Sequence, residues 1–159
     1  MNKIFEIKKF YTIIFIISLL SLLVALYIEF FLDYKPCKLC IYQRIPYLIA
    51  IFLTFLGISY SKNLICLYAL LITFFSSFLL SGYHFGIEQE IFKEFSGCTG
   101  NSINITDKNE LLKLLNSEIN SCKNVDFNFF GLSLAAINLL LSFTIFILIL
   151  KVIKNEKNK

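Results

Sequence analysis

Four long segments without a charged residue dominate the pattern of hydrophobic and polar positions along this chain of 159 residues. They cover residues 10–28, 45–61, 64–83 and 127–150. Each is about 17 to 24 residues long, and a helix needs about 20 mostly apolar residues to cross a hydrocarbon core about 30 Å thick. The pattern therefore predicts an all-α membrane protein, a single domain folded as a four-transmembrane-helix bundle with outer loops at about 29–44 and 84–126.

The composition agrees with a membrane protein and argues against a nucleic-acid partner. Hydrophobic residues make up 57 % of the chain and its mean hydropathy is +0.73, whereas soluble domains are about 45–50 % apolar. Charged residues make up only 16 %, and no basic stripe with interleaved aromatic residues accompanies the net charge of +4. We therefore expect membrane lipid as the surroundings and no binding of nucleic acid.

Details of the segments predict how they are connected. The first carries twelve Ile, Leu, Phe or Val residues between Tyr11 and Ile28, and no A-x-A-like cleavage site follows it. A retained span is therefore expected rather than a cleaved signal peptide. Pro46 is expected in the first turn of the second span, where its missing N–H costs little. The short turn at residues 61–63 predicts a tight hairpin of antiparallel helices.

Lysine and arginine are concentrated at the ends of the chain, and this predicts the orientation of the bundle. Eight of the fifteen lie in the N-terminal tail, the short turn and the C-terminal tail, at positions 3, 8, 9, 62, 151, 154, 157 and 159. Because short cytoplasmic segments are enriched in Lys and Arg, both termini are expected on the cytoplasmic side. The windows at 29–44 and 84–126 then face the outer compartment.

The second outer window contains one helical pattern. Asp107 and Glu110 form a capping-box sequence before apolar positions that recur with helical spacing, at 111, 112, 114, 115 and 119. A short amphipathic helix is expected there. It would either lie on the membrane surface or pack its leucines on the tops of the spans, and the sequence leaves both arrangements open.

Four of the five cysteines fall in the two outer windows: Cys37, Cys40, Cys98 and Cys122. An oxidising compartment permits disulfides there, and four cysteines allow three connectivities, among which the sequence does not choose. Proximity makes Cys37 with Cys40, and Cys98 with Cys122, the default pairing. The second bridge would close a loop of about 25 residues and stabilise the fold by about 3.5 kcal/mol on the chain-entropy model. A purely structural role therefore remains open for it.

The spacing of Cys37 and Cys40 favours chemistry over bracing. A bridge across two intervening residues constrains little chain, whereas C-x-x-C is the spacing of exchanging dithiols and of metal knuckles. No metal is predicted, because 23 residues separate the other two outer cysteines and an oxidising face favours disulfides. Cys40 lies at the N-terminal edge of the second span and Arg44 follows one turn later, so a depressed thiol pKa is expected at Cys40.

Arg44 and His84 are the candidate polar groups at the outer interface. Arg44 could equally be an interfacial anchor, a common role of arginine at the end of a span. His84 is the only histidine and ends the third segment, where a solvated helix cap is the alternative. Together they could bind the headgroup of an apolar electron carrier. Cys66, near the inner end of the third segment, is interpreted as a packing residue.

Several motifs occur together along the chain. They are Cys-x-Leu-Cys-x-Tyr-Gln-Arg at 37–44, Tyr-His-x-Gly-x-Glu at 83–88, and a cysteine pair in a long second outer loop. With these motifs the chain resembles the DsbB family, the quinone-coupled disulfide oxidoreductases of the bacterial inner membrane. The segment at 131–140 is also similar to the closing segment of that family. The resemblance covers nearly the whole chain and implies that the catalytic loops face the periplasm.

The resemblance also implies a role for each candidate residue. A DsbA-like periplasmic thiol oxidase would attack Cys98, and Cys122 would resolve the mixed disulfide. Electrons would then pass to Cys37 and Cys40, and Cys40 would face a quinone, either ubiquinone or menaquinone. The residues that would hold the quinone oxygens are Arg44 and His84. The chain departs from the family at 95–98, because this stretch lacks the proline that often surrounds the loop cysteine.

Two other functions are alternatives to this one. A vitamin K epoxide reductase-like enzyme is also a small helical bundle with cysteines on one side. In such proteins the cysteine motifs follow a different order along the chain, with the loop pair first and the C-x-x-C late in the bundle. This difference disfavours the alternative. A non-catalytic membrane scaffold would use its disulfides only to brace the outer loop.

Overall fold

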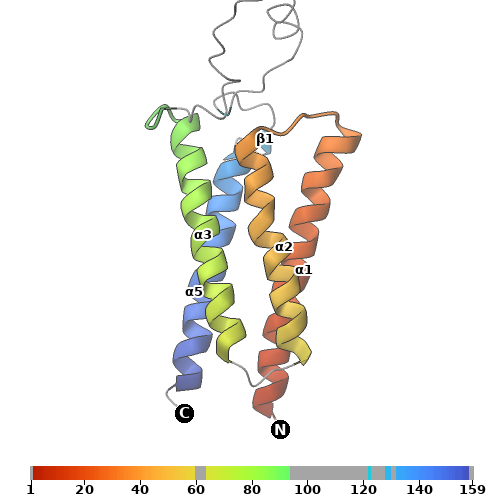
Figure 1. Cartoon of the computed structure of the whole chain (residues 1–159), viewed down its shortest axis with the longest axis vertical. Helices are drawn as coiled ribbons and strands as arrows, with labels where there is room; N and C mark the ends of the chain where they lie inside the picture. Colours follow the sequence, from red (N-terminus) through yellow and green to blue (C-terminus); the bar gives the residue numbers. More distant parts are fainter. Residues whose placement is uncertain (1, 60–63, 94–121, 123–127, 130–131, 158–159) are drawn as a thin grey trace, which may run out of the picture.

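The computed structural model of the protein describes residues 2–59, 64–93, 122, 128–129 and 132–157. In this part of the chain, the helices are α1 (Asn2–Phe31), α2 (Lys38–Ser59), α3 (Leu64–Glu88) and α5 (Leu134–Lys157). A short antiparallel hairpin, β1 (Asn128–Phe129) with β2 (Leu132–Ser133), directly precedes α5. Figure 1 shows the helices side by side, with the start of α1 and the end of α5 at the same end of the bundle.

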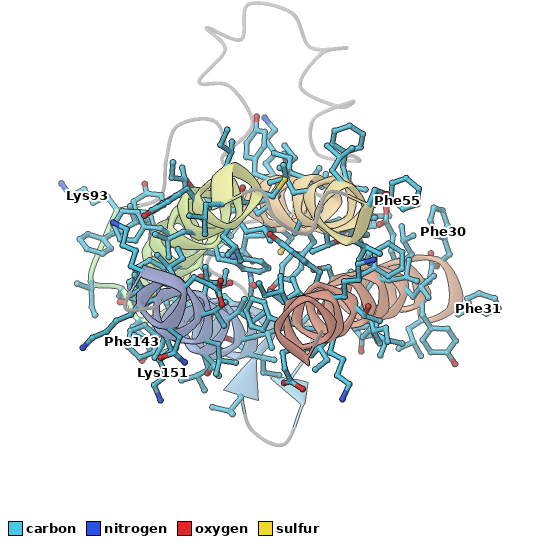
Figure 2. The ribbon with its side chains drawn as sticks, turned by 90° about the horizontal axis from the view of Figure 1, so that it is seen from below. Phe30, Phe31, Phe55, Lys93, Phe143 and Lys151 are labelled. Carbon is cyan, nitrogen blue, oxygen red and sulfur yellow. The ribbon has the colours of Figure 1, made fainter. Side chains whose placement is uncertain are left out.

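All four of these helices are long and apolar enough to cross a membrane. The packed pairs are α1 with α2, α2 with α3, and α3 with α5. Large apolar side chains such as Phe30, Phe55 and Phe143 point outward (Figure 2), and helices that are apolar on their outer faces suit contact with lipid. The prediction of a four-helix membrane bundle is confirmed. The amphipathic helix expected near 107–119 lies outside the described residues.

The helices extend beyond the uncharged segments from which they were predicted. α2 begins at Lys38, well before residue 45, and α3 continues to Glu88, past residue 83. Charged residues mark the edges of an apolar segment, but they do not interrupt the backbone hydrogen bonds of a helix. Cys40, Arg44 and His84 therefore lie inside helices.

Pro46 lies in the interior of α2 and not in its first turn, so the prediction for this residue was wrong. The error follows from the earlier start of the helix. Because proline has no N–H, Pro46 cannot donate the usual hydrogen bond to the carbonyl of Tyr42. Membrane helices tolerate such a proline where neighbouring groups satisfy the freed carbonyl, and Pro46 is buried within the bundle.

α5 begins at Leu134, later than residue 127, where the fourth uncharged segment starts. The chain before it forms the hairpin, in which Asn128 pairs with Ser133. Ser133 then caps the helix, because its Oγ accepts the N–H of Ala136 over 3.1 Å, as an N-cap serine does. The start of this helix is therefore set by a serine inside an otherwise apolar stretch.

The half of the bundle nearer the chain termini is tightly packed. Tyr11, Leu70 and Phe74 are fully buried there. Gly57 of α2 lies directly against the ring of Tyr11, and a Cβ at Gly57 would stand only 2.6 Å from Tyr11 Cε1. Small residues allow membrane helices to approach in this way, which explains a glycine within a membrane span.

α3 ends in a turn that contains a residue with positive φ. Glu90 has a φ of 60°, and the N–H of Ile91 donates to the carbonyl of Gly86 over 2.8 Å. This is the six-to-one bond of a Schellman motif. It closes the C-terminal end of α3 directly after Glu88.

Candidate active site

The two cysteines of the C-x-x-C sequence lie at the start of α2. Cys37 is the N-cap, because its carbonyl accepts the N–H of Ile41 over 3.2 Å and its Sγ accepts the N–H of Cys40 over 3.2 Å. Cys40 is the third residue of the helix. An N-cap side chain turns back over the first turn, so the local fold brings the two sulfurs together.

The two sulfurs share a hydrogen bond. Cys37 Sγ donates to Cys40 Sγ over 2.8 Å, and both residues are free thiols. This bond, together with burial, raises the pKa of the Cys37 thiol from its ordinary value of 9.0 to about 12, and the hydrogen bond with His84 acts in the opposite direction. The nearest polar partner of Cys40 is therefore Cys37, whereas the sequence had suggested Arg44.

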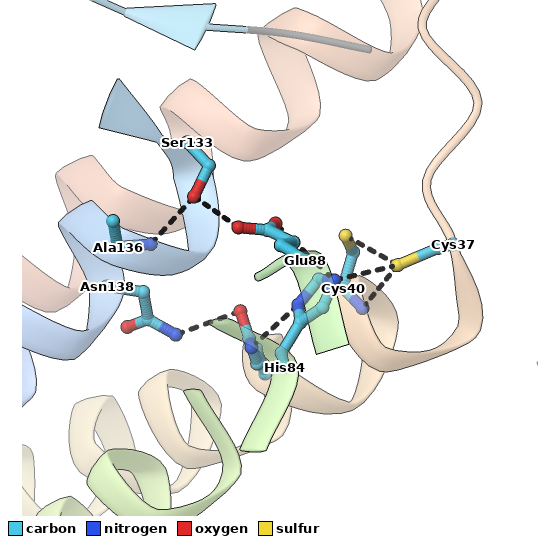
Figure 3. Close-up of polar contacts among 8 residues, drawn as sticks. Cys37, Cys40, His84, Glu88, Ser133, Ala136 and Asn138 are labelled. Atoms are coloured by element: carbon cyan, nitrogen blue, oxygen red, sulfur yellow. Dashed lines mark hydrogen bonds and ion pairs between the residues drawn. The ribbon is translucent and has the colours of Figure 1, made fainter. Parts of the chain in front are cut away.

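His84 is buried between the cysteines and a carboxylate (Figure 3). Its Nε2 lies 3.6 Å from Cys37 Sγ and 3.8 Å from Glu88 Oε1. Ser133 donates to the other carboxylate oxygen of Glu88, which ties α3 to the start of α5. Only 3 % of His84 is exposed, so a solvated helix cap does not describe this residue.

Two amide side chains connect His84 to the centre of the bundle. Gln43 Nε2 lies 3.0 Å from His84 Nδ1, and Asn138 Nδ2 donates to Gln43 Oε1 over 3.1 Å. The hydroxyl groups of Tyr47 and Ser142 both donate to Asn138 Oδ1. A continuous row of hydrogen bonds therefore links α2, α3 and α5.

Arg44 of α2 forms an ion pair with Glu29 of α1, between Nη1 and Oε2. The two side chains are only 19 % and 27 % exposed. Arg44 and Cys40 both line one cavity, as their spacing of four residues suggested. The guanidinium group, however, contacts a carboxylate from another helix and not the thiol.

Cys122 packs against the C-x-x-C pair although it is distant in the sequence. It is 1 % exposed and belongs to the same buried cluster as Cys37 and Ile87. Cys66 lies in the other core cluster, in the half of the bundle nearer the termini. Cys98 lies outside the described residues. Three of the four candidate cysteines are thus brought together.

A cavity of ≈ 490 Å³ opens between α1, α2 and α5. Most of its surface is apolar, and leucine, isoleucine, valine and alanine side chains from α1 and α5 supply ten of its 23 lining residues. Its reactive and charged residues include Cys37, Cys40, Arg44, His84 and Glu88. Binding sites for small organic molecules commonly have about 300–1,000 Å³ and a few polar groups in an apolar wall. The cavity therefore suits an apolar ligand with a polar headgroup.

Cys37, Cys40 and His84 also have to be considered as metal ligands, since their ligand atoms lie within 4.8 Å of one another. Two thiolates at about 2.3 Å from a tetrahedral zinc ion stand about 3.8 Å apart. The sulfurs are 2.8 Å apart, so they would have to separate before such an ion could bind. This geometry suits a dithiol better than a metal centre, and the expected lack of a metal stays a prediction.

Together these groups define one class of site. Two thiols in contact lie at a helix N-terminus, and a third buried cysteine packs against them. Thiol–disulfide exchange requires sulfurs that can approach one another and exchange partners. The fold and the site therefore define a membrane-embedded thiol–disulfide oxidoreductase.

Comparison with known proteins agrees with this class. The family described as disulfide bond formation protein DsbB matches residues 8–152. A protein of Rickettsia prowazekii (strain Madrid E), described as uncharacterized protein RP370, is 30 % identical over 137 residues, which make up 82 % of this chain and 78 % of that protein. The chain belongs to the DsbB family, and this membership supports disulfide bond formation as its activity.

Sequence reasoning assigned no role to several residues near the thiols. Gln43 and Glu88 appeared only as members of the motifs, and Glu29, Ser133 and Asn138 were missed. A signal was present, because polar residues inside membrane spans are rare and mark functional sites by default. Asn138 lies within the fourth uncharged segment and could have been found in this way. Glu29 stands one residue beyond the first segment and was therefore assigned to the loop.

Proposed function

We propose that this protein oxidises a DsbA-like periplasmic dithiol protein and passes the electrons to a membrane quinone, either ubiquinone or menaquinone. The observation that carries the proposal is the position of the Cys37–Cys40 pair. The pair packs against Cys122 and also lines the apolar cavity. A thiol pair with these two neighbours can receive electrons from a loop cysteine and release them to an acceptor in the cavity.

In this scheme exchange begins at a disulfide between Cys98 and Cys122. A thiolate of the reduced partner attacks Cys98, a mixed disulfide forms, and Cys122 leaves as a thiolate. The second thiolate of the partner then attacks the mixed disulfide, so that the partner gains a disulfide and Cys98 is released. Two electrons have then moved from the partner to Cys98 and Cys122.

The contact between Cys122 and the Cys37 cluster supports the next exchange. The Cys122 thiolate attacks Cys37 of a Cys37–Cys40 disulfide, and Cys40 leaves as a thiolate. The Cys98 thiolate then attacks Cys122 of the mixed disulfide, and Cys37 leaves as a thiolate. This restores the loop disulfide and leaves the two electrons on Cys37 and Cys40.

The residues of the cavity wall fit a quinone. Arg44 presents a cation in a mostly apolar wall, where a quinone oxygen could accept a hydrogen bond, and Cys40 lies in the same wall. When bound, a quinone accepts two electrons and two protons and becomes a quinol. Glu29 holds the Arg44 guanidinium by ion pairing. His84 lines the wall as well, but its nearest reactive neighbour is Cys37.

An acceptor outside the cysteine relay is needed on energetic grounds. DsbA is a strong oxidant near −120 mV, and for two electrons each 30 mV of shortfall costs about 1.4 kcal/mol. Structural disulfides lie below about −300 mV, so an ordinary disulfide could not regenerate such an oxidant. A lipid-soluble acceptor removes this difficulty and also gives a reason for embedding the relay in a membrane bundle.

We further propose that the protein resides in the bacterial inner membrane, with both termini in the cytoplasm and the loops that carry the candidate catalytic cysteines in the periplasm. Two observations support this orientation. The start of α1 and the end of α5 share one end of the bundle (Figure 1), and the lysine-rich tails belong to that end. Lysine and arginine are enriched in cytoplasmic segments.

The proposal is tested by mixing the purified protein anaerobically with a reduced DsbA-like protein and a ubiquinone analogue, and following quinone absorbance. We expect rapid quinone reduction by the wild type and by Cys66→Ser, whose cysteine lies in the other core cluster. We expect none by Cys40→Ser. Wild-type quinone reduction no faster than that of Cys40→Ser would rule out the oxidase function.

A further inference from the structure

The row of hydrogen bonds that ends at His84 has a definite direction. Asn138 Oδ1 accepts from the hydroxyls of Tyr47 and Ser142, which uses both of its lone pairs. The Oγ atoms of Ser77 and Ser142 are 2.9 Å apart. Since the single hydrogen of Ser142 goes to Asn138, Ser77 donates to Ser142. The hydroxyl groups therefore all donate in the direction of Asn138, Ser77 through Ser142 and the other two directly.

This direction continues through the two amides. Asn138 presents its NH₂ group to Gln43 Oε1 over 3.1 Å, and the NH₂ group of Gln43 then faces His84 Nδ1 at 3.0 Å. An amide nitrogen only donates. Nδ1 therefore accepts, and in the neutral ring the proton is carried by Nε2.

The surroundings of Nε2 agree with this assignment. Two acceptors face it, Cys37 Sγ at 3.6 Å and Glu88 Oε1 at 3.8 Å. Reversing the row would require both amides to turn over together. The hydroxyl of Tyr47 would then face the NH₂ group of Asn138. It would have to donate to a serine hydroxyl, which is a weaker acceptor than an amide oxygen.

The sulfur of Cys37 is thereby surrounded by N–H donors. It accepts the backbone N–H of Cys40 over 3.2 Å and faces His84 Nε2, while its own hydrogen points to Cys40 Sγ. Hydrogen bonds from N–H groups to sulfur favour the thiolate over the thiol. Once its proton leaves, Cys37 has two donors ready to hold the negative charge.

We propose that Gln43 and Asn138 are positioning residues that hold His84 in the Nε2–H tautomer, so that the ring donates to the sulfur of Cys37 and supports negative charge there. The assignment of the tautomer stands on the hydrogen-bond geometry alone. Its use in disulfide exchange rests on the proposed function. In this tautomer Nε2 is a donor, and it is available neither as a base for Cys37 nor as a metal ligand.

Nuclear magnetic resonance tests the tautomer directly, because His84 is the only histidine of the chain. The reduced full-length protein, labelled with ¹⁵N in the imidazole ring, is measured in detergent micelles without quinone or partner. We expect a protonated Nε2 and an unprotonated Nδ1, whose ¹⁵N shifts differ strongly. A proton on Nδ1, or an even mixture, overturns the assignment.

Two variants test what sets the tautomer. Gln43→Met removes the donor to Nδ1, and Asn138→Leu frees Gln43 to turn over, so the Nδ1–H population should rise in both. Gln89→Met is the matched control, because Gln89 is exposed at the end of α3; its spectrum should equal that of the wild type. Wild-type spectra in both folded variants would show that the amides do not set the tautomer. If one variant fails to fold, the other decides.

The support of charge at Cys37 has its own readout. In a Cys40→Ser background, Gln43→Met should slow alkylation of Cys37 by iodoacetamide severalfold, and Gln89→Met should leave the rate unchanged. Equal rates in the two variants would remove this role. Because neither measurement uses quinone or partner, their failure is distinguishable from a failure of the oxidase assay.

Discussion

Arg44 of α2 and Glu29 of α1 form an ion pair in the wall of the cavity, and both are mostly shielded from solvent. The pair joins two of the packed helices of the bundle. It also fixes the direction of the only arginine in the chain. If either the guanidinium group or the carboxylate is removed, the remaining charged group loses this partner in mostly apolar surroundings.

This arrangement predicts a stability effect that depends on both residues. Arg44→Met should destabilise the protein by about 1–3 kcal/mol, since it leaves the Glu29 carboxylate without its partner. The double variant with Glu29→Gln should recover most of this loss. Thermal unfolding in detergent micelles measures both values. A double variant no more stable than Arg44→Met would show that the pair is not coupled.

The same substitution separates a ligand role of Arg44 from an anchoring role. If the guanidinium group binds quinone, Arg44→Met raises the KM for quinone more than the KM for the dithiol partner. The double variant recovers stability but keeps the high KM for quinone. Equal effects on both KM values would identify Arg44 as an anchor only.

The hydrogen bond between the sulfurs predicts a pH effect. The pKa of Cys37 is raised because its S–H donates to Cys40 and because it is buried, so its thiolate forms at higher pH than that of a free thiol. Cys40→Ala removes the acceptor and should lower the pKa of Cys37. The rate of Cys37 alkylation, read by peptide mass spectrometry, should then level off at lower pH than in the wild type. Identical pH profiles would contradict this cause.

The buried contact of Cys122 predicts a specific cross-link. With Cys40→Ser and Cys98→Ser combined, mild oxidation should join Cys37 to Cys122, as these belong to one cluster. Cys66 should stay reduced, since it lies in the other cluster. Mass spectrometry of the digested protein identifies the bond. A product that joins Cys66 to either residue would argue against the observed packing.

The contact between Gly57 and Tyr11 predicts the effect of added volume. Gly57→Ala places a Cβ 2.6 Å from the Tyr11 ring and should destabilise by about 1–3 kcal/mol through overpacking. Gly82→Ala is the control, because its Cβ would meet Leu139 at an ordinary 3.5 Å. There the change should be neutral or stabilise by up to about 1 kcal/mol. Thermal unfolding of the two variants measures both effects. A midpoint of Gly57→Ala that is not lower than that of Gly82→Ala would contradict the prediction.

The four helices could be predicted from the sequence because the bilayer demands long apolar segments, and charge alone marks their edges. Their true ends could not be read in this way. Cys37 and Ser133 start α2 and α5 through capping, and neither position is marked by charge. Hydropathy reports the depth of a residue in the membrane, whereas capping decides where the helix begins.

The contacts that the site residues make with other helices could not be predicted from the sequence either. The spacing of Cys40 and Arg44 correctly indicated a shared face, but not that Arg44 would meet Glu29. Partners from another helix depend on how each helix is rotated about its axis. In these spans the lipid-facing and core-facing sides are both apolar, so the pattern carries little information about rotation. The contact of Gln43 with Asn138 was hidden for the same reason.

Cys37 is both the cap of a helix and a reacting sulfur. Its Sγ accepts the N–H of Cys40 while the two thiols are reduced. In the proposed exchange, a bond from Cys37 to Cys122 would engage the same sulfur and weaken its hydrogen bond with this N–H. Loss of a cap costs about 1 kcal/mol of helix stability, so this step of the proposed scheme would weaken the first turn of α2, which carries Cys40. The stability of the start of α2 would then depend on the redox state of Cys37.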